Sequence, residues 1–155
     1  MRRSDREITD ITHIDRILNE AQVCRLALYD SDYPYIIPMC FGYTLHEGQL
    51  VLYFHCAAQG RKIDLIKANN NAAFELDKLQ KIISSDIACN FSAAFESITG
   101  KGEIEIISGI EKLTGLNQIM KKYSNAEHKY SEQTLNNVVV LKLTVNEFSC
   151  KASDI

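Results

Sequence analysis

The sequence lacks the features that mark several large classes of protein. Among its 155 residues, no apolar run approaches the roughly 18–20 residues that a helix needs to span a bilayer, and the first residues lack the apolar segment of a signal peptide. The formal net charge is −3, so no basic excess provides affinity for a phosphate backbone. We therefore expect neither a membrane protein nor a nucleic-acid-binding protein.

Disulfide and metal-binding motifs are also missing. The five cysteines are odd in number and form no C-x-x-C pair, which disfavours a disulfide scaffold and a zinc ribbon. His13, His46 and His128 lie far apart and lack the spacing of metal ligands. We expect no metal site, and we expect reduced, mostly buried thiols in a cytoplasmic protein.

The composition and the length are those of a single domain that spans residues 1–155. The sequence is 46% hydrophobic and 24% charged, which is ordinary for a soluble globular protein. The length is sufficient for a hydrophobic core. No G-x-G-x-x-G motif follows a first strand, so a Rossmann fold fits poorly.

Hydrophobic periodicity predicts six or seven strands, two substantial helices and a short one. Thr12 is the expected N-cap of the first helix, and Pro38 is expected at a sheet edge or a bulge. The expected strands cover residues 23–29, 35–43, 50–55, 71–77, 93–107 with a kink around Gly100, and 138–145, while 78–90 stays unassigned and 146–155 is expected as a tail. Strands joined by short turns favour antiparallel pairing. The expected fold is therefore mainly β with helices (α+β), a small closed antiparallel barrel.

The stretch Gly60-Arg61-Lys62 lies where a strand that ends at His55 passes through a short loop into a helix. Two cations in the first turn oppose the positive end of the helix dipole, which costs a few tenths of a kcal/mol. A bound anion would remove this conflict, because it would meet free backbone N–H groups as well as two positive charges. The residues alone leave two interpretations open, a phosphate site and a solvated cationic loop.

Several ordered motifs carry a resemblance to a known family. They are Tyr35-x-x-Pro38-Met39-x-Phe41-x-Tyr43, Leu52-Tyr53-Phe54-His55-x-Ala57-x-x-Gly60-Arg61-Lys62, Asn69-x-x-Ala72-x-Phe74, Phe95-Glu96-Ser97-Ile98-x-x-x-Gly102 and Glu111-Lys112-x-x-Gly115-Leu116-x-x-Ile119-Met120. In order and spacing the chain resembles the FMN-binding split barrels related to pyridoxamine 5'-phosphate oxidase, in particular the nitroimidazole-resistance (Nim-type) branch. The resemblance runs from about Thr12 to Ser153. One departure is Ser149-Cys150-Lys151, where the family more often has a glycine before the lysine.

The resemblance implies a split β-barrel that binds FMN at the interface of a homodimer. The phosphate of FMN would lie at Gly60, Arg61 and Lys62. The strand segment Pro38-Met39-Cys40-Phe41 would present backbone groups to the flavin ring, since a ladder broken near Pro38 leaves such groups free. Phe41 and Phe54 could equally be plain core residues.

His55 has two interpretations. A histidine at a strand end is usually a surface residue or a structural one, but the Nim-type branch carries its active-site histidine at this position. An imidazole can donate a hydrogen bond or a proton to a nitro group during reduction. Cys56 is not expected as its partner, because neighbouring residues on a strand point to opposite faces.

Two classes of function follow from the resemblance. The first is an FMN-dependent oxidoreductase that reduces small nitroaromatics such as nitroimidazoles, with hydride supplied by a nicotinamide or another donor. The alternative is a flavin- or haem-binding protein without turnover of its own. The physiological substrate depends on loops that the pattern does not define.

Overall fold

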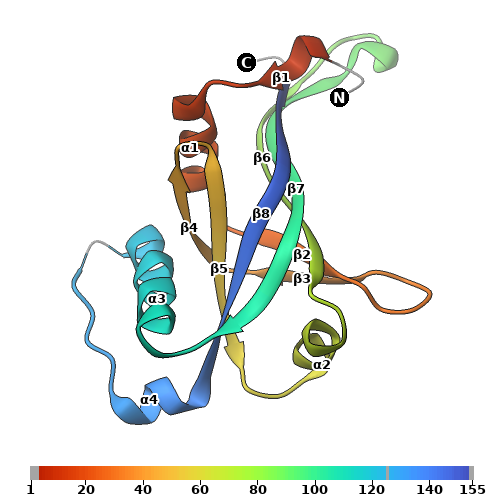
Figure 1. The fold of residues 1–155 in the computed structure, drawn as a ribbon. Helices are drawn as coiled ribbons and strands as arrows, with labels where there is room; N and C mark the ends of the chain where they lie inside the picture. The colour runs from red at the N-terminus through yellow and green to blue at the C-terminus, as the bar shows by residue number, and fades with distance from the viewer. Residues whose placement is uncertain (1–3, 125, 154–155) are drawn as a thin grey trace.

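The computed structural model describes residues 4–124 and 126–153. Eight strands form one antiparallel sheet in the order β3–β2–β6–β7–β8–β5–β4, and β1 pairs with β8 (Figure 1). The strands are β1 (Glu7–Ile8), β2 (Cys24–Leu28), β3 (Tyr35–Met39), β4 (Phe41–His46), β5 (Gln49–Ala57), β6 (Asn71–Ile83), β7 (Ser92–Ile107) and β8 (Val138–Ser153). The predicted mainly β fold with antiparallel pairing is confirmed.

The outermost strands of this order, β3 and β4, are consecutive in the chain and are separated by Cys40 alone. The sheet therefore coils until its two edges approach each other at this residue. Across the described residues β3 pairs with β2 and β4 pairs with β5, but the two edge strands β3 and β4 do not pair with each other. The closed barrel expected from the strand pattern is thus open along this line, as the resemblance to split barrels implies. Pro38 lies on the edge strand β3, where its missing N–H leaves no gap in a central ladder.

The core fills the barrel because side chains alternate along each strand. In β5, Leu50, Leu52, Phe54 and Cys56 point inward and are buried. Two helices close the barrel with apolar side chains, which are Ile14, Ile17 and Leu18 of one and Ile63 and Ile66 of the other. Each such side chain contributes about 1.5–3 kcal/mol when it is fully buried.

The helices are α1 (Ile11–Glu20), α2 (Arg61–Ala68), α3 (Gly109–Tyr123) and α4 (Glu132–Asn137), with short 3-10 turns η1 (Ser4–Arg6) and η2 (Ala88–Asn90). The expected cap of the first helix is wrong. Asp10 is the N-cap of α1, and its carboxylate accepts a hydrogen bond from the His13 backbone N–H at 2.9 Å. Thr12 lies inside the helix, because the carboxylate two residues earlier already satisfies this N–H.

Two segments extend further as strands than the sequence pattern indicates. β6 continues through the unassigned segment as far as Ile83, and β8 continues through the expected tail as far as Ser153. Both extensions pair with the long strand β7, whose ladder shifts register between Lys101 and Gly102, close to the predicted kink. Across residues 4–124 and 126–153, no helix has the length and apolar character required to cross a membrane.

Helix α3 packs on the outside of the sheet over β4 and β5, and a glycine permits the contact. A Cβ atom on Gly42 would lie 2.3 Å from the backbone nitrogen of Ile119 and 2.6 Å from the carbonyl oxygen of Gln118. Backbone atoms of a helix cannot yield as the end of a flexible side chain can, so any larger residue pushes α3 off the sheet.

We expect Gly42→Ala to lower the free energy of unfolding by about 1–3 kcal/mol, the range for overpacking. Urea denaturation measures this change. Gly48→Asn is the matched control, because Gly48 has a φ of 81° at the β4–β5 turn and open space around it, and asparagine tolerates this conformation. Equal stability of Gly42→Ala and the parent would contradict the close approach.

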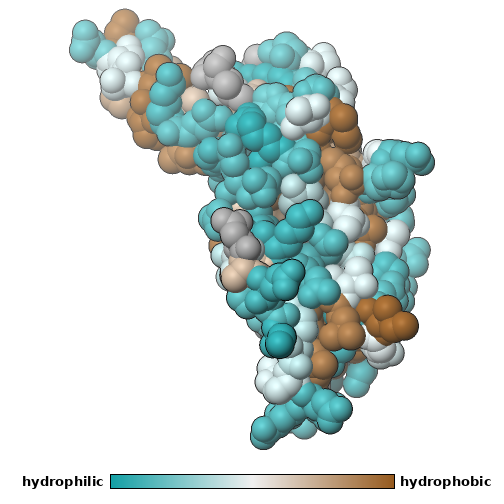
Figure 2. Space-filling view, turned by 90° about the vertical axis from the view of Figure 1, so that its left-hand side faces the viewer, coloured by the Kyte–Doolittle hydropathy of each residue, from teal (hydrophilic) through white to brown (hydrophobic). Residues whose placement is uncertain are grey.

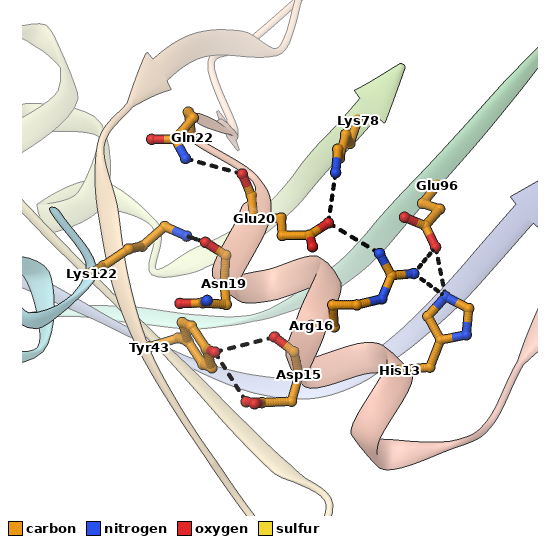
Figure 3. A network of polar contacts seen from close by, with 10 residues as sticks. All are labelled: His13, Asp15, Arg16, Asn19, Glu20, Gln22, Tyr43, Lys78, Glu96 and Lys122. Carbon is orange, nitrogen blue, oxygen red and sulfur yellow. Dashed lines mark hydrogen bonds and ion pairs between the residues drawn. The ribbon is translucent and has the colours of Figure 1, made fainter. Parts of the chain in front are cut away.

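An ionic network anchors α1 to the sheet (Figure 3). The fully buried carboxylate of Glu96 on β7 lies 2.5 Å from Nε2 of His13 and pairs with Arg16. Arg16 also pairs with Glu20, which accepts a hydrogen bond from Lys78 of β6 at 2.6 Å. Burial raises the pKa of Glu96, but hydrogen bonds from His13, Arg16 and a further side chain outweigh it and hold the pKa below its usual value.

A lowered pKa makes Glu96 a source of acid sensitivity. Its contribution to stability is complete above the pKa of the unfolded chain and is lost as the pH falls through the lower folded-state pKa. We expect Glu96→Gln to cost about 1–3 kcal/mol at neutral pH, because it leaves a buried group poorly paired. The difference from the parent should shrink in acid. Unfolding free energies measured across the acid range test this, with Glu103→Gln on the exposed face of the same strand as control. A pH-independent difference would contradict the assignment.

Candidate functional site

The first turn of α2 combines an N-terminus without a side-chain cap and two cationic residues, Arg61 and Lys62. Its N-cap, Gly60, supplies no side-chain hydrogen bond, so the helix lacks the usual partner for its first N–H groups. Gly60 has a φ of 127°, a conformation that favours glycine, and a Cβ atom placed there would have nothing within 4 Å. The space in front of this helix terminus is therefore open.

Arg61 is held at the opening by groups from two other elements. Its guanidinium pairs with Asp30, which follows β2, and its central carbon lies 5.5 Å from the ring centroid of Tyr35 on β3. The Arg61 side chain remains 65% exposed. A guanidinium carries five N–H donors, so the pair with Asp30 leaves donors for an anion. Asp30 and Tyr35 thus hold the Arg61 guanidinium in place, and N–H donors that do not contact Asp30 remain for an anion.

Lys62 places the second charge near the end of β5. Burial raises the pKa of the Cys56 thiol, and the charge of Lys62 offsets part of this rise. The thiol is therefore a protonated core group and a poor nucleophile. His55 is exposed on the opposite face of β5 from Cys56, so the structure separates the two side chains as alternation predicts.

The segment from Pro38 to Phe41 divides between surface and core. Pro38 and Cys40 are exposed, whereas Met39 is 8% exposed and Phe41 is fully buried. The backbone N–H of Phe41 donates to the Tyr123 hydroxyl at 3.1 Å. A ligand on this segment would therefore meet Pro38, Cys40 and backbone groups, and the rings of Phe41 and Phe54 belong to the core.

His55 lies beside the split in the barrel. Phe41 opposite Phe54 is the last pair of the β4–β5 ladder, so His55 is the next residue of β5, where the chain at Cys40 turns away toward β3. On its other side His55 is opposite Val140 of β8. The histidine therefore lies on β5 just past the end of its ladder with β4, on the side where Cys40 separates β3 from β4.

A hollow of about 600 Å³, which we call the apolar hollow, lies at the end of β2 that is away from Cys40. Its walls include the loop 29–34, and its floor includes Ala27 of β2, Ala73 of β6 and Gly102 of β7. The far side of the same loop borders Arg61 and Tyr35 in a smaller cavity of about 370 Å³. One loop therefore separates the apolar hollow from the cationic end of α2.

Some residues of the candidate site could not be recognised from the sequence. Asp30 reads as part of a turn, and its pairing with Arg61 has no local signal because the two residues are far apart in the chain. Tyr123, whose hydroxyl accepts the hydrogen bond of the Phe41 N–H, is the last residue of α3 and lies 82 residues further along the chain. Among the described residues, no group of three or more His, Cys, Asp or Glu side chains is placed to hold a metal ion.

Comparisons with known proteins agree with this architecture. The family model described as pyridoxamine 5'-phosphate oxidase matches residues 10–152. A candidate 5-nitroimidazole antibiotic resistance protein from Bacteroides thetaiotaomicron is 30% identical, with a TM-score of 0.81 over 96% of this chain and 90% of the other. A search among curated proteins gave no match.

Two further solved structures share the fold at lower identity. The flavocytochrome Anf3 from Azotobacter vinelandii is 19% identical with a TM-score of 0.82, over 100% of this chain and 72% of the other. The FAD and heme binding protein from Mycobacterium smegmatis is 18% identical with a TM-score of 0.84, over 97% and 74%. At these identities the similarity concerns the fold alone.

Proposed function

The chain belongs to the pyridoxamine 5'-phosphate oxidase family, and from this premise we propose that it is an FMN-binding oxidoreductase that reduces small nitroaromatics of the nitroimidazole type. The observation that carries the proposal is the uncapped first turn of α2, where Gly60 leaves open space next to the first two helical residues, both of them cations. The branch assignment is supported by the similarity to the Bacteroides protein.

The phosphate of FMN would be held at this turn. Backbone N–H groups of the first turn of α2 would donate to the phosphate oxygens, and Arg61 and Lys62 would neutralise their charge. Asp30 and Tyr35 would keep the guanidinium in place while it binds. A dianionic phosphate fits a site with two cations and a helix N-terminus better than a neutral ligand does.

The ring side of the site would be formed by the exposed part of the β3–β4 segment and by His55. Pro38 and Cys40 would contact the flavin, together with backbone groups of this segment other than the Phe41 N–H, which donates to Tyr123. When bound, FMN supplies the redox chemistry by passing hydride or electrons from a nicotinamide or similar donor to the nitro group. His55 would donate a hydrogen bond or a proton to the nitro oxygens, which gain charge during reduction.

We further propose that the protein works as a homodimer in the cytoplasm, with FMN at the interface of the two copies. The five cysteines are all free thiols, which is typical of a reducing compartment. The split beside Cys40 and His55 is open to the outside, so a second copy can cover a ligand that lies there.

The absorption spectrum of the purified protein, before and after incubation with FMN, is the first test. We expect a flavin spectrum and stoichiometric uptake of FMN, followed by NAD(P)H oxidation that depends on an added nitroimidazole. A haem spectrum, or FMN uptake with no nitroimidazole-dependent oxidation, would favour a binding protein without turnover. A protein that takes up no flavin would overturn the proposal.

A further inference from the structure

The outer parts of β6 and β7 project beyond the barrel as a ribbon, which we call the arm (residues 79–94). Within the described residues, the ladder of β7 with β8 ends at Phe95 opposite Ser153, so the arm beyond it pairs β6 with β7 alone. Figure 1 shows the arm, joined through η2, rising away from the barrel. A two-stranded ribbon is marginally stable by itself in water.

The arm is apolar where it is exposed. Leu79 is 57% exposed, Ile82 60%, Ile87 61% and Phe91 55%. Figure 2 shows hydrophobic residues on the part of the molecule that projects at the upper left. A projecting ribbon that exposes four large apolar side chains within one segment, residues 79–91, indicates a surface that another molecule covers.

The arm and the apolar hollow lie on the same face of the sheet. Side chains alternate along β6, so Leu79 shares its face with Ala73, on the floor of the hollow. Leu79 is opposite Phe95 and Ile82 is opposite Ala93, which places Ile82 on this face as well. The hollow is therefore at one end of the face and the arm at the other.

Between the two ends the face is charged and internally paired. Arg25 of β2 pairs with both Glu75 and Asp77 of β6. Arg25 contacts both carboxylates, so this cluster is paired within one chain and keeps an excess of one negative charge. Along the strands, this face therefore presents first the apolar arm, then the charged cluster of Arg25, Glu75 and Asp77, and then the apolar hollow.

This order is self-complementary. A two-fold axis that crosses the strands at the middle of the face brings the projection of each copy to the hollow of the other, and the two contacts are identical. We propose that the arm of each protomer lies in the apolar hollow of a second copy of this chain. The contact closes on itself, and the paired charges of the two copies meet around the axis.

The exchange places the arm of the partner beside the cofactor site. The loop 29–34 forms a wall of the hollow and also carries Asp30, which orients Arg61. An arm seated in the hollow fixes this loop and thereby the position of the guanidinium. The inference rests on the homodimer proposed above and names the elements that form it.

Sedimentation velocity at micromolar concentration tests the exchange. Ile82→Asp/Phe91→Asp places charges on the arm, and Ala73→Arg fills the floor of the hollow. We expect the parent to sediment as a dimer, and each variant to sediment as a folded monomer with a dimer dissociation constant raised about 100-fold or more. Ile110→Asp is the control, because Ile110 is 85% exposed on α3, outside this face, and it should remain dimeric.

Mixing the arm variant with the hollow variant separates a lost contact from a lost fold. The mixed dimer keeps one intact contact, an unaltered arm in an unaltered hollow, so dimers should return at concentrations where each variant alone is monomeric. Dimeric arm or hollow variants, or a mixture that stays monomeric, would overturn the exchange and leave the flavin proposal intact. A monomeric parent would overturn both the exchange and the homodimer. A dimeric parent that takes up no FMN would overturn the flavin proposal alone.

Discussion

His55→Ala is expected to lower nitroaromatic reduction about 100-fold, the low end for the loss of a general acid, while the protein keeps its FMN and its assembly. The side chain is exposed on β5 at the split of the barrel, and it is directed away from the core. Its removal therefore leaves no cavity. The loss should appear in the reaction with the nitro group and not in the binding of the cofactor.

The measurement is the single-turnover reoxidation of photoreduced flavin with and without a nitroimidazole. His55→Gln should recover part of the rate if hydrogen bonding alone matters. His46→Ala is the matched control, because His46 is exposed at the other end of the β4–β5 hairpin and its side chain is 87% exposed. Unchanged rates in His55→Ala, combined with a loss of stability, would make His55 a structural residue and would favour the binding protein without turnover.

Arg61→Ala and Lys62→Ala are each expected to weaken FMN binding by about 1.5–3 kcal/mol, the range for hydrogen bonds to charged groups. At about 1.4 kcal/mol per factor of ten, this corresponds to roughly 10- to 150-fold in the dissociation constant. Arg61 should show the larger effect of the two, since Asp30 and Tyr35 hold its planar donors in place before the ligand arrives.

Riboflavin, which lacks the phosphate, distinguishes a binding role from a structural one. Its affinity should be nearly the same for both variants and the parent, as measured by fluorescence titration. Lys67→Ala removes a charge from the last turn of the same helix and should leave FMN affinity nearly unchanged. A fall in riboflavin affinity as large as that for FMN would show that Arg61 and Lys62 shape the fold. An equal effect of Lys67→Ala would indicate a general field of positive charge.

The sequence was most informative where the physics is local. Alternation in β5 is a pattern of a few residues, and the strand expected over residues 50–55 is observed over Gln49–Ala57. The arm and the end of β8 were missed, because their strand character comes from pairing with β7 and not from their own apolar periodicity. The N-cap was misplaced by two residues because Asp10 and Thr12 both have side chains that can cap a helix.

In the candidate site, too, features set by short sequence patterns were predicted and features set by long-range contacts were not. The turn at Gly60 with its two cations is a short contiguous pattern, and the structure gives it open space. The partners of Arg61 come from the end of β2 and the start of β3, and they meet it only after the barrel has formed. The burial of Met39 and Phe41 follows from the coiling of the sheet at Cys40, which no short pattern specifies.

The place of β8 in the sheet has a consequence for how the chain folds. β8 lies between β7 and β5 and follows both of them in the sequence. Val51 of β5 therefore cannot pair with Thr144 of β8 until the chain has been synthesised that far. While the chain emerges from the ribosome, β5 has only its hairpin partner β4, and one edge of each growing sheet stays bare. Contacts this distant in sequence slow folding toward milliseconds to seconds. Until β8 is synthesised, the nascent chain has two partial sheets, β3–β2–β6–β7 and β5–β4, and their unpaired edges favour aggregation in this interval.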